Sequence, residues 1–309
     1  MKRPINHRFL PLLPVGVFTA TLLLISCDLF SDENKAVIDP VPYFEVDATP
    51  AWSPSGRYIA YRHDPRINED STGVTGLYLL DLETDSTRLL IEGPAHSPTW
   101  RPNGERIAFS TGDIYTIAPD GSDLRHIVSL ENAFFPRYSP DGQALAFYST
   151  SGEVGGTWFF HFGDSTLTHF GSGENPDWSP SGERIVYVND RKLWTADTSR
   201  TDSTRLTEYN PGEDRYPNWG PSGEQIAWLR REDSGEDSSC KVNLVRPSGT
   251  GRRSLTECTM VPSLTWGPDG RRLIFPKRAP ESRSTALWMI RRDGSGLRQL
   301  TDPTNNPLN

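Results

Sequence analysis

The chain has 309 residues, with 40 acidic and 32 basic side chains and a formal net charge of −8 at pH 7. An acidic chain without a basic stripe argues against nucleic acid and against anionic lipid headgroups as partners. The composition is rich in Gly, Pro and aromatic residues and modest in aliphatic ones. This balance is typical of many short strands and turns, and it is not the composition of a disordered chain.

The first predicted element is an export signal. Lys2, Arg3 and Arg8 precede an uncharged apolar stretch over residues 9–25, which is the pattern of a charged n-region followed by an h-region. The stretch ends in Leu24-Ile25-Ser26-Cys27, which resembles the lipobox of bacterial lipoproteins. The resemblance implies cleavage before the cysteine and acylation of its thiol and its amino group. An ordinary secretory signal, or an uncleaved signal anchor with an incidental cysteine, stays open as the alternative.

We therefore predict a lipoprotein signal peptide over residues 1–26, and an acylated Cys27 with a polar tether over residues 27–45. Several acyl chains would hold the protein stably at a membrane, because each buried methylene contributes about 0.8 kcal/mol. The expected location is the bacterial cell envelope, facing the periplasm or at the outer membrane, with the lipid anchor as the only membrane contact.

A five-residue phrase then recurs six times, with an aromatic residue first, Pro third and Gly fifth. The phrases begin at Trp52, Trp100, Tyr138, Trp178, Trp219 and Trp266. A period of about 40 residues is typical of blades, solenoids or arrays. Pro suits the second position of a type I turn, and Gly accepts the left-handed conformation that follows, so each phrase predicts a tight turn.

Each turn leads into a short apolar run, such as Ile59-Ala60-Tyr61, which predicts a strand buried on both faces. A third segment, such as Leu77-Tyr78, and a fourth, such as Arg88-Leu89-Leu90, complete each unit. Four strands per unit and six units predict an all-β fold: a six-bladed β-propeller over residues 46–303, with four antiparallel strands per blade. Residues 304–309 would form a C-terminal tail. An open β-solenoid is the competing architecture, but its rungs are usually far shorter.

These segments also carry a family resemblance. The phrase followed by Ile107-Ala108-Phe109, Ile114-Tyr115 and segments such as Arg205-Leu206-Thr207 resembles the repeats of TolB-type propellers, and Asp214 to Trp219 closely matches their blade entrance. The resemblance covers about residues 49 to 302 and implies a fold rather than an activity, since similar blades occur in peptidases and polysaccharide-degrading enzymes. TolB carries an α/β domain before its propeller, whereas this chain has a short linker there. We expect a propeller-only lipoprotein that lacks the TolB N-terminal domain.

Two cysteines remain besides Cys27. Cys240 and Cys258 flank a hairpin in the fifth unit and are equally distant from Gly249, so a symmetric register places them opposite one another. In an oxidising compartment this predicts a disulfide. Two reduced thiols, or a register shifted by one residue so that they face apart, are the alternatives.

Motifs of catalysis are mostly absent: there is no Gly-x-Ser-x-Gly elbow, no His-Glu-x-x-His and no phosphate loop. The serines of the repeated phrase are interpreted as turn residues. The histidines His63, His96, His126, His161 and His169 fall at unlike places in their units. We therefore predict no catalytic residue, no metal site and no cofactor, although lyases with a related propeller use histidines and acids around a divalent cation.

Loops on a rigid scaffold are the usual place for recognition. Between successive units, a candidate binding rim at the mouth of the propeller channel comprises His96, Phe135, Asn175, Asp214, Arg215 and Tyr216. Arg215 and Tyr216 would supply a charged donor and an aromatic surface. A structural Arg–Asp pair and a ring that packs between blades are the alternatives for the same residues.

The leading hypothesis is a non-catalytic module that binds an envelope protein or peptide, or a carbohydrate. The alternative is a propeller enzyme, related to polysaccharide lyases or peptidases, with a site at the channel mouth. A third hypothesis is a sensor or scaffold for a small sugar. An enzyme would need perturbed acids or histidines that converge on a pocket.

Overall fold

The computed structural model describes residues 46–65, 74–150, 155–208, 212–232, 240–259, 263–280 and 284–302. Within these ranges the regular secondary structure consists of β-strands, so the all-β prediction is confirmed. The same ranges hold no helix that is long and apolar enough to cross a membrane. The predicted signal peptide, Cys27, the tether and the C-terminal tail lie outside the described residues.

The strands follow the sequence repeats, and we name repeats 1 to 6 after the six phrases. Repeat 1 comprises β1 (Val46–Trp52), β2 (Tyr58–Asp64), β3 (Gly76–Asp81) and β4 (Ser86–Glu92). Repeat 2 comprises β5 (His96–Trp100), β6 (Ile107–Ser110), β7 (Gly112–Ile117) and the first half of β8 (Arg125–Tyr138). Repeat 3 comprises the second half of β8, β9 (Ala144–Ser149), β10 (Gly156–His161) and β11 (Thr166–Gly171).

The last three repeats have the same composition. Repeat 4 comprises β12 (Glu174–Trp178), β13 (Arg184–Asn189), β14 (Lys192–Asp197) and β15 (Ser203–Arg205). Repeat 5 comprises β16 (Glu213–Trp219), β17 (Ile226–Arg231), β18 (Cys240–Val245) and β19 (Arg253–Cys258). Repeat 6 comprises β20 (Thr265–Trp266), β21 (Arg272–Arg278), β22 (Thr285–Arg291) and β23 (Arg298–Gln299).

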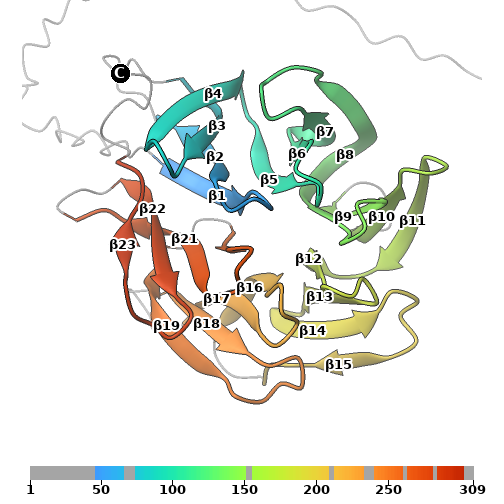
Figure 1. Ribbon diagram of the computed structural model, residues 1–309. Coiled ribbons are helices and arrows are strands. Elements are labelled where there is room, and N and C mark those ends of the chain that lie inside the picture. The colour runs from blue at the N-terminus through green and yellow to red at the C-terminus, as the bar shows by residue number, and fades with distance from the viewer. Residues whose placement is uncertain are drawn as a thin grey trace, which may run out of the picture. The chain divides into compact units, whose positions relative to one another are not determined.

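Neighbouring strands within each repeat are antiparallel. Repeats 4 and 5 are separate four-stranded sheets, whereas the long strand β8 joins repeats 2 and 3 into one sheet of seven strands. Repeats 1 and 6 share a sheet through a single parallel pair between β1 and β22, at Val46 and Thr285. In Figure 1 the repeats follow one another around a common centre, with β1, β5, β12 and β16 innermost in their repeats.

The repeated phrase forms the predicted turn in every repeat. The amide of its glycine donates to the carbonyl three residues earlier at 2.8–2.9 Å, as from Gly56 to Ser53. All six glycines have a positive φ between 62° and 77°, which is the conformation that favours glycine. The serine hydroxyls belong to the turns: Ser139 Oγ, for example, accepts from the Ala144 amide at 2.9 Å.

The second strands supply the core, as predicted. Ile59, Ala60 and Tyr61 are almost completely buried, and the equivalent runs in the other repeats are buried to the same degree. Small residues in the middle of these runs let adjacent sheets approach. The indole groups of Trp100, Trp178 and Trp266 also bond the repeat before their own. Trp100 Nε1 donates to the Ala51 carbonyl at 3.0 Å, and Trp178 Nε1 donates to the Arg137 carbonyl at 3.1 Å.

Cys240 and Cys258 form the predicted disulfide across β18 and β19, with their Cα atoms 5.0 Å apart. They are direct partners in the register of the two strands. The hairpin is not symmetric throughout, because the register shifts by one residue beyond Val242. A bulge of this kind recurs between the third and fourth strands of repeats 1, 2 and 3, so it belongs to the repeat rather than to the disulfide.

Candidate binding site around the central cavity

Each repeat has a strained residue near its start, in its first strand in repeats 1 to 5 and just before the first strand in repeat 6. These residues have a positive φ without being glycine, and they are Thr49, Ser97, Phe135, Asn175, Tyr216 and Ser263, with φ between 50° and 78°. In the first five the next residue is proline, which disfavours the α region for the residue before it. Such conformations cost about 1–3 kcal/mol each and tend to occur at functional sites. Three of them, Phe135, Asn175 and Tyr216, belong to the predicted rim.

Phe135 and Tyr216 lie together although they come from repeats 3 and 5. Their ring centroids are 5.4 Å apart, and Phe134 lies 6.4 Å from Phe135. Asn175 of repeat 4 is buried beside them, and its Oδ1 accepts from the Tyr216 amide at 3.5 Å. Phe135 and Tyr216 are both partly exposed. The predicted rim therefore contains an aromatic surface that no single repeat supplies.

Charged groups flank this aromatic surface. Arg215 Nη2 lies 2.9 Å from Glu213 Oε2, and Glu213 is also within 3.4 Å of Arg191 and 3.9 Å of Arg231. The hydrogen bond from Arg215 is the main cause that lowers the pKa of Glu213. Arg215 remains partly exposed, so it can contact a partner beside the Tyr216 ring.

Asp214 does not belong to the accessible rim. Its side chain is 0% exposed, and its Oδ1 accepts from Arg230 Nη1 at 2.7 Å and from Trp228 Nε1 at 2.9 Å. The alternation of side chains along β16 turns Asp214 inward while Arg215 faces outward. A structural Arg–Asp pair therefore exists, but Asp214 pairs with Arg230 rather than with Arg215.

The histidines do not converge. His96 is half-buried, and burial is the main cause that lowers its pKa, with a further lowering by Arg62 and an opposing effect of Asp64. His126 instead bonds Asp113 at 2.8 Å, and the buried His63 bonds Asp47 at 2.7 Å. In the part of the chain that the structure describes, no group of three or more His, Cys, Asp or Glu residues could hold a metal ion.

A cavity of about 180 Å³ lies below the rim and is lined by residues from all six repeats. We call it the central cavity. Arg137 Nε and Asp177 Oδ1 are 3.7 Å apart in it, and Arg137 Nη2 donates to Ser263 Oγ of repeat 6 at 3.1 Å. Asp177 Oδ2 accepts from Asn218 Nδ2 at 2.9 Å and from the Trp219 amide at 2.7 Å. Burial raises the pKa of Asp177 to about 6, against the opposing effects of Arg137 and of these hydrogen bonds.

This polar cluster was not among the predicted site residues. The sequence does contain a signal for it. In repeats 1 to 5 one residue stands between a proline and the aromatic residue that begins the phrase. It is Ala51 and Thr99 in repeats 1 and 2, but Arg137, Asp177 and Asn218 in repeats 3 to 5. Only the arrangement of the repeats around one cavity shows that these side chains meet.

Antiparallel four-strand repeats around a central cavity define an all-β protein of the propeller class. Comparison with known proteins identifies the family: residues 132–306 match the family described as TolB beta propeller domain. The chain belongs to the TolB β-propeller family.

Individual proteins are more distant. The chain is 27% identical to dipeptidyl-peptidase 5 of Porphyromonas gingivalis, over 41% of this chain and 21% of the relative. It is also 27% identical to the Tol-Pal system protein TolB of Francisella tularensis subsp. mediasiatica, over 46% of this chain and 45% of the relative. The chain thus spans less than half the length of these two curated relatives. The crystal structure of TolB from Acinetobacter baumannii superposes with a TM-score of 0.67 at 18% identity, covering 77% of this chain and 62% of that one.

Proposed function

We propose that this chain is a lipid-anchored, six-bladed β-propeller of the cell envelope that binds an envelope protein or peptide and does not act as an enzyme. In this proposal residues 1–26 are a signal peptide, residues 27–45 an acylated tether, residues 46–303 the propeller and residues 304–309 a tail. The observation that carries the binding function is the partly exposed pair of Phe135 and Tyr216, which two strained strands hold beside Arg215.

Contacts between the innermost strands support a closed ring. β1 contacts β5, β5 contacts β8, β8 contacts β12, β12 contacts β16, β16 contacts β20, and β20 contacts β1. At the junction of repeats 6 and 1, Trp52 packs in one cluster with Ile274, Leu287 and Met289. The Arg272 guanidinium lies 4.8 Å from the centroid of the Trp52 ring. Each repeat would then be one blade, and closure would leave no open sheet edge at the junction.

The rim is suited to a protein or peptide partner. Aromatic and Arg side chains carry much of the binding energy in protein interfaces, especially where rigid elements hold them in place. The polar groups beneath the rim are paired with one another, Arg137 with Asp177 and Asp214 with Arg230. Groups that are paired in this way support a binding surface more than a reaction centre. The relative named as a Tol-Pal system protein supports an envelope partner of this kind.

The experiment is affinity capture from envelope extracts of the native host with the full-length anchored protein. A protein or peptide recovered by the wild type should be recovered at least about tenfold less by the double variant Phe135→Ala/Tyr216→Ala, because two interface aromatics are removed. Tyr58→Ala is the matched control, since Tyr58 is also a partly buried aromatic but belongs to the turn side of repeat 1. Equal recovery by the double variant would show that the rim is not the binding surface.

The anchor needs its own test, because Cys27 lies outside the described residues. Radiolabelled palmitate should be incorporated into the wild type and not into Cys27→Ala, and the variant should leave the membrane fraction. Label in the variant, or a variant that stays in the membrane fraction, would contradict the lipobox assignment.

A further inference from the structure

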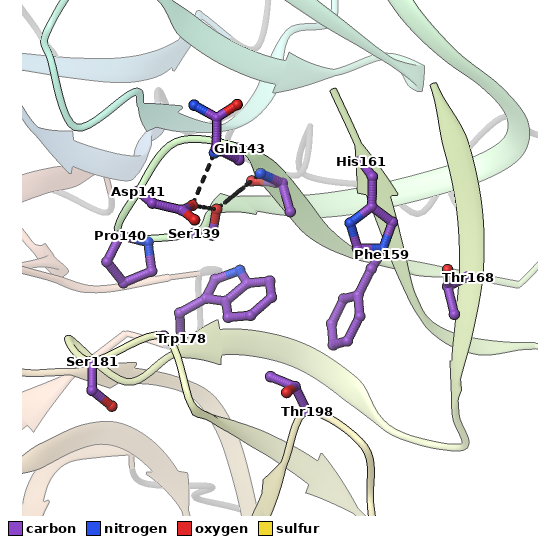
Figure 2. A pocket seen from close by; sticks show the side chains of 12 residues that line it. Ser139, Pro140, Asp141, Gln143, Phe159, His161, Thr168, Trp178, Ser181 and Thr198 are labelled. Atoms are coloured by element: carbon purple, nitrogen blue, oxygen red, sulfur yellow. Dashed lines mark hydrogen bonds between the residues drawn. The ribbon is translucent and has the colours of Figure 1, made fainter. Parts of the chain in front are cut away.

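A cleft of about 680 Å³ lies between repeats 3 and 4, beside their repeated turns (Figure 2). Two aromatic side chains, Phe159 and Trp178, lie in it with ring centroids 5.0 Å apart. The turn residues Ser139 to Asp141 and Ser181 border it on one side, and Thr168 and Thr198 border it on the other. We call it the inter-repeat cleft.

One residue that lines the cleft, Thr168, differs in type from most of its counterparts in the other repeats. The relevant position is on the fourth strand of each repeat. In repeat 1 it is Arg88, which pairs with Leu79, the residue after the aromatic Tyr78 of the third strand. In repeats 1 to 6 this residue is Arg88, Arg125, Thr168, Thr204, Arg253 and Arg298. Four of the six are arginines, and repeats 3 and 4 have a threonine.

Two of these arginines bridge to the next repeat. Arg88 Nη2 donates to the Pro119 carbonyl of repeat 2, and Arg253 Nη2 donates to the Arg292 carbonyl of repeat 6. Pro119 and Arg292 each follow the first residue of a hairpin turn, and Thr198 holds the same position in repeat 4. The pair Thr168 and Thr198 is too short to span the same distance. The space that a guanidinium fills between repeats 1 and 2 and between repeats 5 and 6 therefore stays open between repeats 3 and 4.

One aromatic ring at the cleft is more accessible than its counterparts, whereas Phe159 beside it is only 5% exposed. The first residues of the other five phrases, Trp52, Trp100, Tyr138, Trp219 and Trp266, are 8% exposed or less. Trp178 is more exposed than all of them. Its indole N–H donates to the Arg137 carbonyl, so the ring is held in a fixed orientation while it borders the cleft.

The lining selects for an uncharged ligand with an apolar face and polar edges. Hydroxyl, amide and imidazole groups of Thr168, Gln143 and His161 surround the aromatic pair, and none of the described lining residues is Lys or Arg. The Asp141 carboxylate is already engaged, since its Oδ1 accepts from Ser139 Oγ at 2.6 Å and from the Gln143 amide at 2.9 Å. A sugar ring has this combination of an apolar C–H face and hydroxyl groups around its edge.

We propose that the inter-repeat cleft binds a neutral oligosaccharide, with one pyranose ring against Trp178, whose indole packs on the buried Phe159. A second hollow of about 540 Å³ continues from the cleft along the outer edge of repeat 3 and shares Gln143, His161 and Thr168 with it. The combined length favours a chain of several sugars over a single one. This site is separate from the rim and does not depend on the protein-binding function.

The test is isothermal titration calorimetry of the disulfide-intact protein with cellotriose, maltotriose and triacetylchitotriose, and with trigalacturonate as an anionic oligomer of equal length. We expect at least one neutral trisaccharide to bind with a Kd of about 1 mM or lower, and trigalacturonate to bind at least about tenfold more weakly. No heat from any neutral trisaccharide at about 10 mM, or equal affinity for trigalacturonate, would overturn the proposal.

A matched pair of variants localises the binding. Thr168→Arg restores the residue type of repeats 1 and 5 at an exposed position, and it should fill the cleft and weaken binding at least about tenfold. Thr204→Arg makes the same change at the equivalent exposed position of repeat 4 and should bind like the wild type. Unchanged binding by Thr168→Arg would show that the sugar lies elsewhere. Capture of a protein partner through the rim should be the same for both variants.

Discussion

The carboxyl group of Asp177 makes the stability of the protein depend on pH with a defined sign. Its pKa is raised from an ordinary value of 3.8 to about 6, mainly by burial in the central cavity. The folded protein therefore holds this proton more tightly than the unfolded chain does. The stabilisation is fully present below pH 3.8 and is lost as the pH rises through about 6. Because one pH unit of pKa difference corresponds to about 1.36 kcal/mol, the full effect is about 3 kcal/mol.

Replacing Asp177 with Asn removes this titration and keeps the size of the side chain. The free energy of unfolding of the wild type, minus that of Asp177→Asn, should fall by about 2–3 kcal/mol between about pH 4 and about pH 7. The loss of charge opposite Arg137 adds a constant offset, so only the change with pH is diagnostic. Urea unfolding followed by Trp fluorescence at a series of pH values measures it.

Asp120→Asn is the control for this experiment. Hydrogen bonds from Ser122 lower the pKa of the exposed Asp120. The free energy of unfolding of the wild type, minus that of Asp120→Asn, should therefore rise with pH over the acidic range instead of falling. A difference for Asp177→Asn that is flat or rises with pH would refute the reasoning, because it would mean that Asp177 ionises in the cavity without cost.

Two further predictions concern the disulfide and the ring. Replacing Cys240 and Cys258 with Ser should lower the free energy of unfolding by about 3 kcal/mol, given the loop that the bond closes. A non-reduced digest that yields the two cysteine peptides separately would contradict the bond. For the ring, a double-mutant cycle of Trp52→Leu and Arg272→Met should give a coupling energy of about 0.5–1 kcal/mol. Strictly additive effects in urea unfolding would mean that Trp52 and Arg272 do not interact across the junction of repeats 6 and 1.

The features that could be predicted from the sequence are those that each repeat makes by itself. The turn at Gly56, the buried run Ile59 to Tyr61 and the hairpin of Cys240 and Cys258 depend only on neighbouring residues and on one antiparallel register. The same patterns recur six times, so a single misleading segment could not change the interpretation.

Features that arise between repeats could not be predicted in the same way. The position between two units predicts Asp214 at the rim, but its orientation depends on Arg230 and Trp228 of the next strand. Phe135 and Tyr216 are in contact although the whole of repeat 4 separates them in the sequence. No local pattern encodes which side chains meet across the centre, since that depends on how many repeats surround it and on their tilt.

At some positions a residue differs in type from its counterparts in the other repeats. Where neighbouring side chains fill the space and make the hydrogen bonds, the difference is structural; where a hollow remains, the position is a candidate site. Asn243 stands where the other third strands have an aromatic residue, and its cross-strand partner is Trp228, a larger side chain than its counterparts in the other second strands. Asn243 Oδ1 also accepts from Ser254 Oγ at 2.6 Å. The larger indole therefore fills the space, and the amide oxygen of Asn243 has a hydrogen-bond partner. Thr168 has no such compensation, because Thr198 across the cleft is also small and a hollow remains. Packing gives no reason for a hollow beside Thr168, and for that reason this departure, unlike the one at Asn243, points to a ligand.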